Sequence, residues 1–141
     1  MKRVGKVVAY ITRGDRLLVF THRDFPEVGV QVPAGTIDNP DDLEGEVLRE
    51  ATEETGLTQL KVKSYLGSND FDASIFRPEI HERHFFHLEA EGPVEDKWLH
   101  FENHPTGGAA PIAFSFYWCA IKDANLFADQ GAMLHKIERT L

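Results

Sequence analysis

The spacing of hydrophobic and polar positions changes along the chain, and each change predicts a different element. β-Branched and aromatic residues dominate residues 3–12 and residues 16–20, with Gly14-Asp15 between them, which is typical of a β-hairpin. Other short apolar runs predict further extended segments. We expect these segments at residues 30–32, 61–67, 82–89 and 113–121.

Over residues 42–55, the spacing between apolar residues matches the period of an α-helix. Four apolar residues share one stripe of this helix and should face the core: Leu43, Val47, Leu48 and Ala51. Asp41 or Asp42 is suited to cap its first turn, and Gly56 follows as the residue that ends it. We expect a second helix near the C-terminus, over about residues 124–139.

Strands and helices follow one another without a regular βαβ alternation, which favours a mixed sheet. We therefore expect an α/β (α+β) fold in which a mixed β-sheet is sandwiched between α-helices. The segment Phe101–Pro111 contains Gly107 and Gly108 together with two prolines, so we expect a loop there. Our hypothesis is that this loop becomes ordered when substrate binds.

The chain has 141 residues, of which 42% are apolar and 27% charged, as expected for one ordinary domain over residues 1–141. Its net charge of −8 disfavours binding to a long nucleic acid, but a small phosphorylated ligand remains compatible. No apolar run is long enough to span a membrane. The single cysteine, Cys119, fits a reducing compartment, so we expect a cytoplasmic protein, either a monomer or a homodimer.

Acidic residues gather on one side of the predicted helix. Glu46, Glu50 and Glu54 are four residues apart, Glu53 falls on the same arc, and Arg49 lies at its edge. Like charges at this spacing destabilise a helix by roughly 0.2–0.5 kcal/mol per pair. The cluster therefore favours a divalent cation such as Mg²⁺, whose preferred ligands are carboxylate oxygens. The alternative is an acidic helix face that is simply solvated.

The residues around the cluster favour the first interpretation. Gly35 is followed after five residues by Asp41 and, after seven more, by Arg-Glu-Ala-Thr-Glu-Glu-Thr-Gly-Leu at residues 49–57. This stretch resembles the Nudix box: Gly, five residues, Glu, seven residues, Arg-Glu, an aliphatic residue, any residue, Glu-Glu, any residue, Gly and an aliphatic residue. Six positions match in place: Gly35, Arg49, Glu50, Glu53, Glu54 and Gly56.

Two positions depart from the family's pattern. Asp41 stands where the family has glutamate, and its shorter side chain argues against a direct metal ligand, although it could hold a metal-bound water. Glu46 stands at a helix position that is usually small and apolar. We interpret Glu46 as a solvated surface residue rather than as an extra acidic group of the site.

The resemblance implies a Nudix-type hydrolase, a pyrophosphohydrolase that uses Mg²⁺, or alternatively Mn²⁺. Its expected reaction is attack of a metal-activated water on a diphosphate, in a nucleoside diphosphate derivative or a nucleoside triphosphate. The resemblance implies Glu50 and Glu54 as principal metal ligands, completed by the carbonyl of Gly35. Glu53 would be a further ligand or the general base, positioned by Arg49.

Several points stay open at this stage. Some family members take their base from a later loop, and five later acids are candidates here: Glu89, Glu91, Glu95, Asp96 and Glu102. The expected partner is a small nucleotide-like molecule, but neither its identity nor the residues that bind it follow from the sequence. The alternative function is a catalytically weak module of the same fold that senses a nucleotide.

Overall fold

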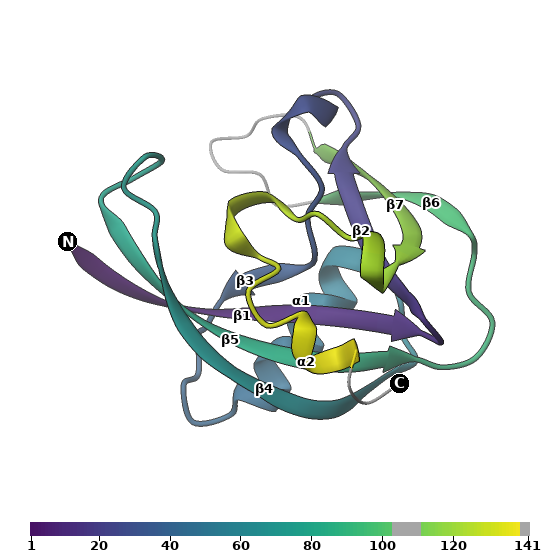
Figure 1. Ribbon diagram of the computed structural model, residues 1–141, viewed down its shortest axis with the longest axis horizontal. Helices are drawn as coiled ribbons and strands as arrows, with labels where there is room; N and C mark the ends of the chain where they lie inside the picture. Colours follow the sequence, from purple (N-terminus) through teal and green to yellow (C-terminus); the bar gives the residue numbers. More distant parts are fainter. Residues whose placement is uncertain (103–110, 139–141) are drawn as a thin grey trace.

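The computed structural model describes residues 1–102 and 111–138 and contains a mixed sheet (Figure 1). Its strands are β1 (Lys2–Arg13), β2 (Arg16–His22), β3 (Ala34–Thr36), β4 (Leu60–Asp72), β5 (Glu79–Ala90), β6 (Lys97–Glu102) and β7 (Ile112–Ala120). Their order is β4-β5-β1-β2-β7-β6, with β3 paired to β1. The β1–β5 pair is parallel and the other pairs are antiparallel, so the predicted mixed sheet is confirmed.

Strands β1 and β2 diverge beyond their hairpin, and this divergence makes room for β3. They pair only at Thr12↔Leu17 and Arg13↔Arg16. Farther along β1, the partner is β3, which places Gly35 opposite Val7. The sheet therefore holds the start of the motif in its middle rather than in a surface loop.

Helix α1 (Leu43–Thr55) packs behind the sheet and confirms the predicted helix (Figure 1). The Asp42 side chain accepts a hydrogen bond from the Gly45 N–H, which caps the first turn. At the other end, Gly56 adopts the left-handed conformation with φ 80°, as expected for a helix terminus. Val47 and Ala51 are buried in the core, and Leu43 and Leu48 pack at its margin.

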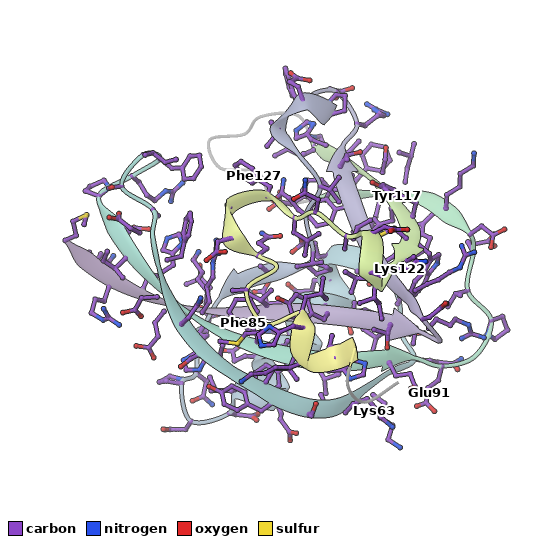
Figure 2. All side chains as sticks on the ribbon, viewed as in Figure 1. Lys63, Phe85, Glu91, Tyr117, Lys122 and Phe127 are labelled. Carbon is purple, nitrogen blue, oxygen red and sulfur yellow. The ribbon has the colours of Figure 1, made fainter. Side chains whose placement is uncertain are left out.

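The opposite face of the sheet is covered by short turns rather than by the predicted helix over residues 124–139. That prediction is wrong: the described part of this segment contains the short turn η4 (Phe127–Asp129) and the short helix α2 (His135–Glu138). Two other short turns are η3 (Ile121–Asp123), just before the segment, and η1 (Pro26–Val28), earlier in the chain. Ala128 and Asp129 have positive φ angles of 55° and 60°, which a continuous right-handed helix cannot contain. These turns still complete a second core, in which Phe85 lies beneath them (Figure 2).

Near the site, the structure differs from the sequence prediction at two places. Residues 34–36 form β3, although the sequence predicted an extended piece only at 30–32, where Gln31 makes an isolated bridge to Phe20. Phe101 and Glu102 belong to β6, whereas the rest of the predicted loop, residues 103–110, lies outside the described residues. Ordering of that loop by substrate therefore stays a prediction. Within the described residues, no helix is long and apolar enough to cross a membrane.

Candidate active site

The site is built on a very close approach of β3 to α1. A Cβ atom added to Gly35 would lie 2.1 Å from the carboxylate of Glu50. Glycine is therefore required at this position for Glu50 to occupy its observed place. Sequence analysis placed both residues in one site, and the structure brings them together.

Glu54 lies one helical turn beyond Glu50, where the helix meets the sheet. The backbone N–H of Ala34 donates to its carboxylate, which lowers the pKa, but burial dominates and raises the pKa of Glu54 to about 8. The charges of Glu50 and Glu102 raise it further. Burial also raises the pKa of Glu50 above its ordinary value. Burial therefore disfavours the ionised forms of both carboxylates.

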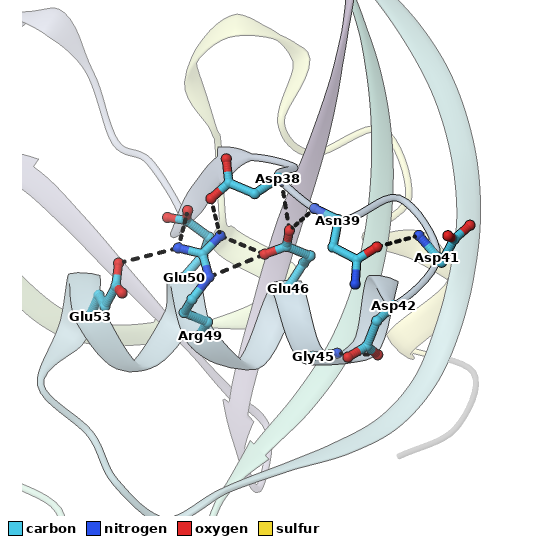
Figure 3. A network of polar contacts seen from close by, with 9 residues as sticks. All are labelled: Asp38, Asn39, Asp41, Asp42, Gly45, Glu46, Arg49, Glu50 and Glu53. Carbon is cyan, nitrogen blue, oxygen red and sulfur yellow. Dashed lines mark hydrogen bonds and ion pairs between the residues drawn. The ribbon is translucent and has the colours of Figure 1, made fainter.

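Arg49 lies between two groups of acids (Figure 3). Its Nη1 is 3.2 Å from Glu50 and 3.6 Å from Glu53, which agrees with the predicted pairing of Arg49 with Glu53. Its Nη2 is 2.5 Å from Glu46 and 3.2 Å from Asp38. One guanidinium thus links four carboxylates.

Glu46 is buried, so its interpretation as a solvated surface residue is wrong. Only 6% of its side chain is exposed. Its carboxylate accepts hydrogen bonds from the backbone N–H groups of Asn39 and Asp38, and from Arg49. Together these bonds hold the pKa of Glu46 below its ordinary value. The signal in the sequence was Arg49, three residues later and hence on the same side of the helix.

Asp41 has a different position from the one that the motif suggested. It is exposed, and its backbone N–H donates to the side chain of Asn39 at 3.1 Å. Its carboxylate points away from Arg49 and Glu50 (Figure 3). Asp38, which sequence analysis did not single out, is the acid of this turn that contacts Arg49.

The carboxylates open into a pocket of about 710 Å³ between α1 and β6. Its described lining residues are Ala34, Glu50, Glu53, Glu54, His100, Phe101, Glu102 and Phe114. Glu102 is thus the one member of the five later acids that lines this pocket. Glu89 lies in β5, Glu91 follows that strand, and Glu95 and Asp96 line separate hollows beside Trp98 and Trp118.

Strand β6, which the sequence did not predict, attaches the end of α1 to the sheet. Trp98 donates from Nε1 to the carbonyl of Thr55 at 2.9 Å, and the Nε2 of His100 is 2.9 Å from the carbonyl of Glu53. These donors satisfy carbonyl groups that the last turn of a helix leaves without partners. Trp98 also stacks on Phe116 of β7, with an interplanar angle of 12°. The wall of the pocket is therefore fixed to the helix that carries its acids.

The donor set fits a hard divalent cation. Glu50, Glu53 and Glu54 supply carboxylate oxygens in one pocket. Burial raises the pKa of Glu54, so a cation that takes the place of its proton would stabilise the ionised carboxylate. Among the described residues, no three acidic, histidine or cysteine side chains already enclose a metal position.

Comparisons with known proteins concern the whole domain. The sequence profile of the NUDIX domain matches residues 1–137. A UDP-X diphosphatase superposes with a TM-score of 0.66 at 17% identity, over 98% of this chain but 61% of that chain, so this chain spans less than two thirds of it. A C. elegans Ap4A hydrolase gives a TM-score of 0.66 at 19% identity, over 99% and 97% of the two chains. The MutT protein from Methanosarcina mazei Go1 gives 0.65 at 16% identity, over 99% and 95%. No curated protein shows significant sequence similarity to the chain.

The raised pKa of Glu54 predicts that the metal-free protein loses stability as the pH rises. Folded protein holds the Glu54 proton up to about pH 8, whereas an unfolded chain releases it near the ordinary pKa of 4.5. Folding therefore binds a proton between these values, and the free energy of unfolding falls through this window. We expect the melting temperature in EDTA to fall from about pH 7 to about pH 8.5, and to fall less for Glu54→Gln.

The measurement starts at about pH 7 because burial also lowers the pKa of His87 from 6.5, and this shift makes stability rise with pH at lower pH values. Glu44→Gln, an exposed change on the same helix, is the matched control and should keep the wild-type slope. Parallel curves for Glu54→Gln and wild type would contradict the assignment.

Proposed function

Because this chain belongs to the Nudix hydrolase family, we propose that it hydrolyses a phosphoanhydride bond in a nucleoside diphosphate derivative or a nucleoside triphosphate. One observation carries the proposal: Glu50, Glu53 and Glu54 open into the same pocket, against the glycine that leaves space for Glu50. Among the structural neighbours, one is named a UDP-X diphosphatase and another an Ap4A hydrolase, which supports a substrate with a nucleotide part.

Glu50 and Glu54 would hold Mg²⁺ or Mn²⁺, with the Gly35 carbonyl completing the ligand set, and Glu53 would be a further ligand if it is not the base. Such a cation would offset the negative charge that develops on phosphate oxygens as the diphosphate bond breaks. The chain's own contribution is to hold Glu50 and Glu54 half-buried in the lining of the pocket, so that little rearrangement is needed when the cation and phosphates arrive.

A carboxylate must also take the proton from the attacking water as the water oxygen bonds to phosphorus. Glu53 is one candidate: it is exposed to the pocket, and Arg49 lies 3.6 Å from its carboxylate. Glu102 is the other candidate, because it lines the same pocket from β6. Our assignment is Glu53 as the base with Arg49 as its positioning residue, and Glu102 is the alternative.

The apolar wall of the pocket suits the nucleoside part of a substrate. Phe101 and Phe114 line the same pocket as the acids of α1. The guanidinium of Arg23 lies over the Phe101 ring, 5.8 Å from its centroid, and brings positive charge to this side. We propose that the base or sugar contacts these rings while the diphosphate lies over the carboxylates.

The first test is turnover of a panel of nucleoside triphosphates and nucleoside diphosphate derivatives, with Mg²⁺ and with EDTA. We expect phosphate or nucleotide release that depends on the cation, and a loss of at least about a hundredfold in Glu50→Gln and in Glu54→Gln. Exposed Glu44→Gln is the control for a change of helix charge. Near-normal turnover in both site variants at saturating Mg²⁺ would refute the ligand assignment, and binding without turnover by the wild type would favour a sensor.

The second test separates the two candidate bases. The measurement is kcat as a function of pH for Glu53→Gln and Glu102→Gln. Removal of a general base lowers the rate by about 10²–10⁴-fold and abolishes the acid limb of the pH–rate profile, which the pKa of the base controls. We expect the larger loss, together with the missing limb, in Glu53→Gln. If Glu102→Gln shows both effects and Glu53→Gln keeps the acid limb, the base comes from β6.

A further inference from the structure

We propose that Glu46 is a positioning residue that acts through Arg49 and keeps the metal-binding carboxylates available to a cation. The inference rests on the proposed function, because it concerns Glu50 and Glu53 as they are used there. Glu46 lies outside the matching positions of the motif, whereas Asp41, at the motif's first acidic position, does not contact Arg49 in the network of Figure 3.

The Glu46 carboxylate is held from two sides. Its Oε1 accepts from the backbone N–H of Asp38 at 2.6 Å and from that of Asn39. Its Oε2 accepts from Nε of Arg49 at 3.1 Å and from Nη2 at 2.5 Å. A buried carboxylate with donors on both oxygens is confined to one orientation. Glu46 therefore fixes Arg49 relative to the turn that follows β3.

The orientation of Arg49 then follows from the shape of its guanidinium. The group is planar and rigid, so fixing Nε and Nη2 against Glu46 also fixes the direction of Nη1. That nitrogen lies 3.2 Å from Glu50 and 3.6 Å from Glu53. Asp38 adds a contact at 3.2 Å, but its side chain is 80% exposed, so water screens the interaction.

Glu46 also sets the charge beside the pocket. An arginine without a partner would bring a full positive charge to Glu50 and Glu53, and would compete with a divalent cation for their oxygens. Glu46 offsets that charge from the side away from the pocket. Removal of its charge should therefore weaken cation binding, an effect that a purely structural role would not produce.

The test is Glu46→Gln, which can keep the acceptor for the Asp38 and Asn39 N–H groups but presents an NH₂ group to Arg49. The measurements are kcat and the Mg²⁺ concentration that gives half-maximal turnover. We expect a higher Mg²⁺ requirement and a combined loss of about 10–100-fold, the usual effect of removing a residue that orients metal ligands. Glu44→Gln and Asp41→Asn remove one exposed charge each and should stay within about twofold of wild type, because water and salt screen such charges.

Two further variants connect the effect to Arg49. In an Arg49→Ala background, Glu46→Gln should cause no further change, because the group through which it acts is gone. Arg49→Lys, which keeps the charge but removes the planar fork, should reproduce part of the defect and serves as the test if Glu46→Gln melts at the assay temperature. A wild-type Mg²⁺ requirement in Glu46→Gln, equal losses in both backgrounds, or a larger loss in Asp41→Asn would overturn the proposal.

Failure of the proposed function gives a different result. If the wild type releases no product from any substrate of the panel, the binding of Mn²⁺, followed by electron paramagnetic resonance, replaces turnover as the measurement. Weaker Mn²⁺ binding by Glu46→Gln than by wild type and Glu44→Gln would then support the role of Glu46. Equal binding by all three proteins would overturn it.

Discussion

Several carboxylates lie half-buried between a helix and a sheet, and this burial raises the free energy of their ionised forms. The rest of the site depends on the groups that stabilise these carboxylates. Within the chain, Arg49 supplies one positive charge, which is shared among Glu46, Glu50, Glu53 and Asp38. Glu54 is left with an Ala34 N–H and with a pKa raised to about 8. In the absence of a metal, a proton stabilises Glu54, and a divalent cation in the pocket would take the place of that proton.

The fold provides this arrangement by bringing three separate segments to the same helix. The divergence of β1 and β2 admits β3, whose glycine lets the backbone approach Glu50. The turn after β3 closes on Glu46 through two backbone N–H groups. Strand β6 holds the last turn of α1 through Trp98 and His100. Each segment meets α1 through hydrogen bonds or close packing, so the carboxylates are held by the fold and not by the helix alone.

The sequence predicted the features that depend on local spacing. The helix over 42–55, its terminal Gly56 and the grouping of Gly35 with Glu50 and Glu54 follow from periodicity and from the motif, because both concern neighbouring residues. Strand β6 was missed because its inward side carries Trp98 and His100, whose polar nitrogens find partners only in the folded protein. The burial of Glu46 likewise depends on the turn at Asp38, eight residues earlier in the chain. The C-terminal helix is interrupted by the positive φ angles of Ala128 and Asp129, which residue spacing does not reveal.

We propose that a divalent cation binds where Glu50 and Glu54 lie against Gly35 and Ala34 of β3. Anomalous diffraction from crystals grown with Mn²⁺ and a non-hydrolysable nucleotide analogue tests this claim most directly. We expect a Mn²⁺ peak within coordination distance of at least two of the pocket carboxylates, with phosphate oxygens of the analogue completing the shell. A Mn²⁺ peak elsewhere on the protein, with the pocket carboxylates still paired only to Arg49, would contradict it.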